Sequence, residues 1–164
     1  MEPRYNNQAD FTVRQATADD TIGIATLLRD LGWSEWIAAA TPESVADQVE
    51  RHLTLCQADD SHSVYVAETP TGEVAGYVSV HWLPYLIHQG PEGYISELFI
   101  KTSARGQGLG SLLLATVRQE AEQRGCARLN LINNRERESY TRQFYKKQGW
   151  EERPWAASFV YWLK

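Results

Sequence analysis

The chain has 164 residues, of which 43% are hydrophobic and 23% charged, and its formal net charge at pH 7 is −5. Such a composition argues against general disorder and predicts a globular domain with a sizeable core. The negative charge and the lack of a Lys- and Arg-rich stretch argue against a nucleic-acid partner. No apolar run approaches the roughly 20 residues of a membrane span, and no signal peptide is recognisable, so we expect a soluble cytoplasmic protein without a membrane partner.

The length predicts a single domain over residues 1–164, with residues 1–10 as a loose polar arm. The two cysteines, Cys56 and Cys126, do not have the spacing of metal ligands and are too few for a disulfide framework. We therefore expect each cysteine to pack as a small apolar residue, and we expect no metal cofactor.

Capping signals and hydrophobic periodicity predict the elements of the first half. Thr17 with Asp20 resembles a capping box, and Thr41 followed by Pro42 is a typical helix start. The predicted order is a strand at 11–15, a helix from 17 to Gly32, a loop with two tryptophans, a helix from 41 to 55, and a hairpin of strands at 63–68 and 74–82.

The second half continues with alternating elements. The predicted order is a loop at 84–93, a strand at 94–100, a polar turn at 101–104, a helix carrying residues 109–121, a strand at 127–133, a helix at 138–148 ended by Gly149, and a last strand at 158–163. We therefore predict an α/β (α+β) fold with a mixed sheet covered by helices on both faces.

A glycine-rich turn lies between the strand at 94–100 and the helix that follows. Gly106, Gly108 and Gly110 allow the backbone to approach a ligand, and the first N–H groups of the helix point toward an anion. A dinucleotide fingerprint is excluded because Ser111 stands at the third glycine position, and no G-K-[ST] follows as in a Walker loop. A nucleotide-binding domain is therefore disfavoured.

Two motifs resemble the GCN5-related N-acetyltransferase (GNAT) family. The first is the R-x-x-G-x-G pattern that begins at Arg105, and the second is the Y-x-K-x-G-W pattern that begins at Tyr145. The upstream order of elements also fits, so the resemblance covers nearly the whole chain. It implies a splayed central sheet whose parted strands hold the pantetheine arm of acetyl-CoA.

The resemblance also implies which residues contact acetyl-CoA. Backbone groups of Leu98, Phe99 and Ile100 would bind the pantetheine arm. Arg105 would add a positive charge near the pyrophosphate. The turn that would wrap the pyrophosphate consists of Gly106, Gln107, Gly108, Leu109, Gly110 and Ser111.

Three residues are candidates for proton transfer. The family motif implies that Tyr145 is the general acid for the leaving thiolate, although an aromatic side chain on a helix can simply pack. Glu97 on the central strand is the first candidate for the base that deprotonates the amine, and His81 on the preceding strand is the second. Alternatively, Glu97 is a solvated strand carboxylate and His81 is an ordinary polar residue of its strand.

Two positions depart from the family pattern. Glu138 stands where many relatives carry an Asn that contacts the cofactor, and Asn133 stands where relatives that acetylate protein N-termini have a catalytic Glu. The cofactor contact from this segment is therefore not expected to be kept. The departure at Asn133 favours a small-molecule amine over a protein N-terminus.

The resemblance places the acceptor pocket between two loops that are rich in aromatic and charged residues. Aromatic faces with carboxylates suit a cationic amine, but the same side chains could pack on the domain or form a homodimer interface. The candidate residues are Trp33, Trp36, Tyr85, His88 and Glu92. The alternative functions are a silent acyl-CoA-binding module and a protein lysine acetyltransferase.

Overall fold

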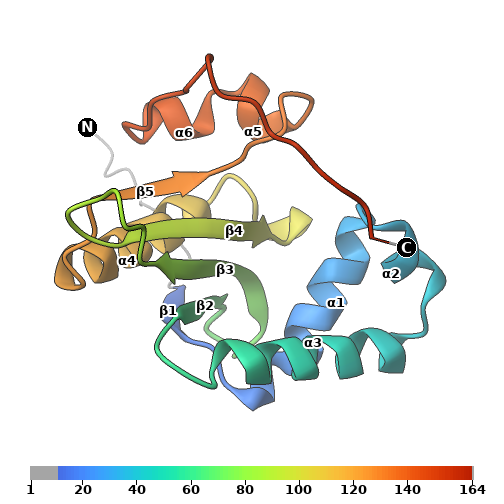
Figure 1. Cartoon of the computed structure of the whole chain (residues 1–164). Coiled ribbons are helices and arrows are strands. Elements are labelled where there is room, and N and C mark those ends of the chain that lie inside the picture. The colour runs from blue at the N-terminus through green and yellow to red at the C-terminus, as the bar shows by residue number, and fades with distance from the viewer. Residues whose placement is uncertain (1–10, 164) are drawn as a thin grey trace, which may run out of the picture. The chain divides into compact units, whose positions relative to one another are not determined.

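The computed structural model describes residues 11–163 and divides the chain into two compact units, one ending at Leu131 and one beginning at Ile132 (Figure 1). The first unit holds the sheet and the longer helices, and the second holds two short helices and the C-terminal tail. Within residues 11–163, no helix combines the length and the apolar character that crossing a membrane requires.

Five strands form one sheet in the first unit, in the spatial order β1-β2-β3-β4-β5. The strands β1 to β4 pair antiparallel with their neighbours, whereas β5 pairs parallel with β4 because helix α4 (Leu109–Gln123) crosses between them. Their bounds are β1 (Thr12–Gln15), β2 (His62–Glu68), β3 (Val74–Leu83), β4 (Glu92–Ile100) and β5 (Arg128–Leu131).

The pairing between β4 and β5 ends halfway along β4. The parallel ladder runs from Glu92 opposite Arg128 to Ile95 opposite Leu131, while β4 continues to Ile100. At the same point a β-bulge leaves Ser96 without a partner in the register with β3. The ladder stops there because β5 itself ends at Leu131, and β4 continues to Ile100 without a β5 partner.

Helices cover both faces of this sheet, as predicted. Alternate residues of β2 point to opposite faces: Val64 and Val66 pack in the core beneath α1 (Thr21–Leu31) and α3 (Pro42–Cys56). On the other face, Ser63 and Tyr65 bond to Glu120 of α4.

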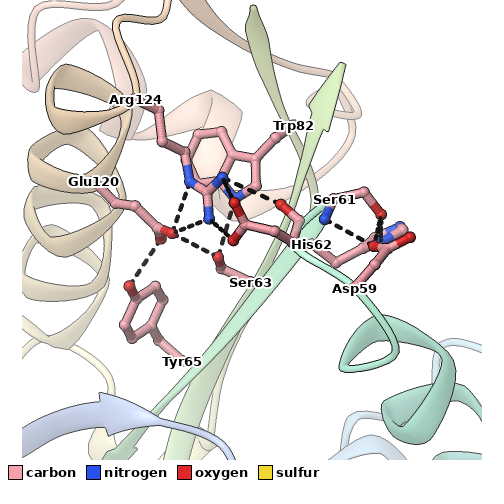
Figure 2. A network of polar contacts seen from close by, with 9 residues as sticks. Asp59, Ser61, His62, Ser63, Tyr65, Trp82, Glu120 and Arg124 are labelled. Carbon is pink, nitrogen blue, oxygen red and sulfur yellow. Dashed lines mark hydrogen bonds and ion pairs between the residues drawn. The ribbon is translucent and has the colours of Figure 1, made fainter. Parts of the chain in front are cut away.

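A polar network fastens α4 to β2 and β3 (Figure 2). The Glu120 carboxylate accepts hydrogen bonds from the Ser63 hydroxyl (2.8 Å), the Tyr65 hydroxyl (2.8 Å) and Arg124 Nε (2.9 Å). The Trp82 indole N–H donates to Ser63, and the Arg124 guanidinium lies 4.8 Å from the centre of the Trp82 ring. The position of α4 on the sheet is therefore fixed by side chains as well as by apolar packing.

The predicted helix signals act as expected in the first unit. Thr17 N–H donates to Asp20 Oδ2 at 2.7 Å in the capping box that opens the short 3-10 helix η1 (Ala18–Asp20), directly before α1. Helix α1 ends at Gly32, whose φ of 63° is left-handed. Thr41 caps α3, because its hydroxyl accepts from Ser44 N–H at 3.2 Å.

Four predictions of secondary structure were wrong in detail. Residues 33–36 are not all loop: Ser34 precedes the short helix α2 (Glu35–Ala39), whose sequence suits a helix. The predicted loop at 84–93 is shorter, because β4 already begins at Glu92.

The other two lie in the second unit. The predicted helix at 138–148 is two helices, α5 (Glu138–Thr141) and α6 (Phe144–Lys147), because Gln143 between them adopts a left-handed φ of 54°. Residues 158–163 form no strand within the described chain, and they are exposed. Alternating apolar residues make a strand only where a neighbouring strand pairs with them.

Candidate functional site

A cavity of about 430 Å³ lies in the first unit, between the sheet and helices α1 to α3. Much of its wall is apolar, and includes Ile24, Leu28, Trp36, Ile37 and Val49. Its polar groups come from α3, β3 and β4, and are Gln48, His52, Cys56, Tyr77, Ser79 and Glu97. A mainly apolar cavity with a few convergent polar groups is typical of a small-molecule site.

Glu97 connects this cavity with the part of β4 that has no β5 partner. It lies opposite Ser79 of β3, immediately after the bulge. Burial raises the pKa of the Glu97 carboxyl above its usual range, while a hydrogen bond from Tyr77 and the nearby His52 act in the opposite direction. A carboxylate with a raised pKa holds a proton more tightly and is a better general base.

Aromatic side chains lie next to Glu97 on the same face of the sheet. The Trp33 ring packs edge-on against Phe99 with 5.0 Å between centroids, and Tyr77 packs against Phe99 at 5.6 Å. Trp36 lines the cavity and is 49% exposed, so it stands at the border with solvent.

His81 lies on β3 and does not line the cavity. Its Nε2 is 2.8 Å from the Ser96 hydroxyl, and its ring lies 4.4 Å from the His62 ring, centroid to centroid. Burial and the neighbouring His62 lower the pKa of His81, which favours the neutral imidazole at pH 7.

The remaining predicted acceptor residues lie elsewhere. Tyr85 and His88 pack against each other in the loop between β3 and β4, with 5.6 Å between ring centroids. Glu92 is 1% exposed and pairs with Arg128 across the β4–β5 ladder; Asn130 also donates to it at 3.3 Å. The Glu92 carboxylate is therefore engaged with Arg128. Of the predicted acceptor residues, Trp36 is the one that the described cavity wall includes.

Several wall residues were not singled out from the sequence as site residues. Gln48, His52 and Cys56 are spaced four residues apart on α3 and share one face, and the Gln48 amide nitrogen lies 2.7 Å from His52 Nε2. Tyr77 and Ser79 alternate on β3 toward the same face. The regular spacing of these three residues can be seen in the sequence, but the spacing alone does not indicate that this face of α3 lines a cavity.

The glycine turn between β4 and α4 has left-handed backbone at two positions. Gly106 and Gly108 have φ values of 76° and 85°, which other residues rarely adopt. The first helical bond of α4 runs from Leu112 N–H to the Gly108 carbonyl at 3.0 Å. The amides of Leu109, Gly110 and Ser111 therefore precede the hydrogen-bonded turns of α4, where N–H groups can face a ligand.

Arg105 and Gln107 brace this turn. Arg105 Nε donates to the Ile100 carbonyl at 3.4 Å, and the Gln107 amide donates to the Ser103 carbonyl at 3.3 Å. Leu98, Phe99 and Ile100 lie on β4 beyond its last pair with β5, so their backbone on that side has no strand partner in the described sheet. The turn and the unpaired part of β4 follow one another along the chain.

Tyr145 belongs to the second unit, on α6. Burial raises the pKa of its phenol to about 12. Its ring packs against Phe144 at 5.0 Å and against Trp150 at 5.9 Å. In the same unit, Asn133 accepts a hydrogen bond from Ser139 at 2.9 Å, and Glu138 pairs with Arg142 at 3.4 Å.

No group of three or more His, Cys, Asp or Glu side chains within residues 11–163 is arranged to hold a metal ion. Separately, the cavity wall carries carboxylate, imidazole, thiol and hydroxyl groups.

Comparison with known proteins identifies the family. Residues 26–150 match the family described as Acetyltransferase (GNAT) family. The chain is 31% identical over 140 residues to an aminoalkylphosphonate N-acetyltransferase of Salmonella typhimurium, covering 85% of this chain and 84% of that one. It is 29% identical over 131 residues to a thialysine N-epsilon-acetyltransferase of Bos taurus, covering 73% and 72%.

Solved structures share the fold. A transcriptional regulator from Bacillus halodurans C-125 superposes with a TM-score of 0.78 at 24% identity, covering 92% of this chain and 99% of that one. The family match extends from α1 through the glycine turn to Trp150, and therefore includes both sequence motifs. The chain belongs to the GNAT family of acetyltransferases, enzymes that use acetyl-CoA as co-substrate.

Proposed function

We propose that this enzyme acetylates the primary amine of a small molecule by direct attack on acetyl-CoA in a ternary complex. The observation that carries the proposal is the position of Glu97, which lines the cavity and lies within the part of β4 that has no β5 partner. An amine in the cavity and a thioester along β4 would then meet at one carboxylate. The acceptors named for two relatives, an aminoalkylphosphonate and thialysine, support a small-molecule substrate.

Acetyl-CoA would bind along β4 and the glycine turn. The unpaired backbone of Leu98 to Ile100 would take the pantetheine arm by strand-like hydrogen bonds. The turn from Gly106 to Ser111 would hold the pyrophosphate with its N–H groups, and Arg105 would add positive charge.

Glu97 would act as the base. An alkylamine is mostly protonated at pH 7, so the ammonium must lose a proton before its nitrogen can attack. The nitrogen then forms the new bond to the acetyl carbon. The carbon–sulfur bond breaks as coenzyme A leaves as a thiolate, and the nitrogen releases its remaining extra proton to solvent to give the amide. Backbone N–H groups of Phe99 or Ile100 would stabilise the oxyanion between these steps. His81 remains the second candidate base.

Tyr145 would stabilise the leaving thiolate. Its raised pKa keeps the phenol protonated at neutral pH. A thiol has a pKa near about 8.5, so complete transfer of a proton from a phenol of higher pKa is unfavourable. We therefore propose that Tyr145 donates a hydrogen bond to the thiolate, which takes its proton from solvent after release.

The test is a thiol-release assay with acetyl-CoA and a panel of alkylamines, polyamines, amino acids, aminoglycosides and lysine peptides. We expect amine-dependent release with small amines and mass-spectrometric detection of the acetylated product. Release that is faster with lysine peptides than with every small amine would assign the enzyme to protein acetylation instead. Release that does not depend on any amine would contradict the proposed transfer.

A further inference from the structure

We propose that the cavity selects amines whose body is uncharged and apolar, and rejects amines that carry a carboxylate or a phosphonate. This inference rests on the proposed function, because it takes the cavity for the acceptor site. It concerns the substrate class, which membership of the family leaves open.

The cavity wall carries one carboxylate, Glu97, and one imidazole, His52, which acts to lower the Glu97 pKa. Glu97 is the carboxylate among the described lining residues, and none of those residues is lysine or arginine. An ammonium group entering the cavity therefore finds an opposite charge at Glu97. A second group of negative charge on the same molecule finds no lysine or arginine in the described wall, and it would be desolvated near a carboxylate.

Two arginines lie on the helices that contribute to the cavity wall. Arg51 of α3 donates to the Gln48 side-chain oxygen at 2.6 Å, and it is not part of the cavity wall. Arg29 of α1 donates to the Ala40 carbonyl at 3.0 Å. Neither guanidinium group belongs to the described cavity wall.

The body of the cavity suits hydrocarbon. Ile24, Leu28, Ile37 and Val49 form walls that offer no hydrogen bond, and Trp36 adds an aromatic face at the border with solvent. Burying one methylene contributes about 0.8 kcal/mol. We therefore expect kcat/KM to rise roughly fourfold per added methylene in a series of linear alkylamines until the cavity is filled.

Three acceptors of matched length test the selection. Hexylamine, 6-aminohexanamide and 6-aminohexanoate present the same primary amine on the same chain and differ at the far end. We expect hexylamine to be the best substrate and the carboxylate to have a kcat/KM at least roughly 100-fold below that of the amide. The same loss is expected for 5-aminopentylphosphonate. A carboxylate or phosphonate acceptor within threefold of the amide would overturn the inference.

A charge substitution in the wall should change this preference. Gln48→Lys places a cation on the cavity side of α3 and should raise the ratio of kcat/KM for 6-aminohexanoate to that for 6-aminohexanamide at least about tenfold. Thr54→Lys is the matched control, because it adds the same charge to an exposed position of α3 outside the cavity wall. An equal rise in both variants would show that net charge, not the cavity, sets the preference, and would contradict the inference.

A second readout does not depend on turnover. Cys56 lines the cavity and Cys126 does not, so ligand binding should slow the alkylation of Cys56 by iodoacetamide, followed by peptide mass spectrometry. Burial raises the pKa of the Cys56 thiol, so the reaction is run at mildly alkaline pH. We expect protection by hexylamine and little protection by 6-aminohexanoate at the same concentration.

The two readouts separate the two claims. Selective protection of Cys56 without acetyl transfer would support the selection and contradict the proposed function. Transfer to anionic amines in preference to neutral-bodied ones would leave the acetyltransferase in place and overturn the selection. Equal protection of Cys56 by hexylamine and 6-aminohexanoate, or protection by neither, would also overturn the proposed selection.

Discussion

At the scale of single residues, Glu97 is the group whose ionisation should control the rate. Its raised pKa in the folded enzyme places the acidic limb of kcat/KM above the ordinary glutamate value of about 4.3. Below that limb Glu97 is protonated and cannot accept the proton of the amine. We expect Glu97→Gln to lower kcat/KM by roughly 10²–10⁴-fold and to remove the limb from the pH profile.

His81→Gln is the control for Glu97, because it changes the second candidate base on the neighbouring strand. We expect this variant to keep the acidic limb, since His81 bonds to Ser96 and stands outside the cavity wall. A profile that loses its limb in His81→Gln and keeps it in Glu97→Gln would assign the base to His81.

Tyr145 provides the second prediction at this scale. Tyr145→Phe removes only the hydroxyl and keeps the packing against Phe144 and Trp150. Hydrogen bonds to charged groups contribute about 1.5–3 kcal/mol, so we expect kcat to fall roughly 10- to 100-fold. Calorimetric titration should give an unchanged affinity for acetyl-CoA. A kcat within threefold of the wild type, with chemistry limiting, would reduce Tyr145 to a packing residue.

At the scale of elements, the glycine turn before α4 makes a prediction with an internal control. Gly108 and Gly32 both adopt left-handed φ values, 85° and 63°, at opposite ends of two different helices. Alanine at either position costs about 1–2 kcal/mol of stability. We expect Gly108→Ala alone to weaken acetyl-CoA binding, measured by calorimetry, because only that turn would approach the pyrophosphate. Equal affinity in both variants would remove the turn from the cofactor site.

The network around Glu120 is the second element-scale test, because it joins α4 to β2. Glu120→Ala leaves the buried Ser63 hydroxyl and the Tyr65 phenol without their acceptor, and each loss costs about 1–3 kcal/mol. We expect thermal unfolding to shift down by roughly 5–15 °C at 2–4 °C per kcal/mol. Asp60→Ala removes the exposed partner of Arg124 and should shift the transition little. Similar shifts in both variants would contradict this account of α4.

At the scale of the whole molecule, sequence signals predicted elements well where they depend only on neighbouring residues. The Thr41 cap and the Gly32 terminus bound their helices as expected, because capping depends on a few neighbouring residues. Gln143 interrupts the helix predicted over residues 138–148, although no glycine or proline in that stretch predicts an interruption. Residues 158–163 have a strand pattern without a strand, because pairing depends on a partner that the pattern does not identify.

The candidate site shows the same difference between features that depend on neighbouring residues and features that depend on distant ones. The motif at residues 105–110 indicated the turn, because the glycines that its left-handed backbone requires can be read directly from the sequence. The cavity wall on α3 and the pairing of Glu92 with Arg128 depend on how distant elements meet. Cys56 illustrates the difference: the sequence predicted a small packed residue, and the structure places its thiol in the cavity wall.

Binding of acetyl-CoA should be visible in the stability of the whole chain. A ligand at 100 times its Kd stabilises the folded state by about 2.7 kcal/mol, which is a rise in Tm of roughly 5–10 °C for a protein of this size. Glu97→Gln should show the same rise as the wild type, because it removes a proton acceptor and keeps the β4 backbone. Gly108→Ala should show a smaller rise, and hexylamine added with coenzyme A should increase the wild-type rise further. Differential scanning fluorimetry with all three proteins measures these shifts, and an equal rise in Gly108→Ala would place the co-substrate away from the glycine turn.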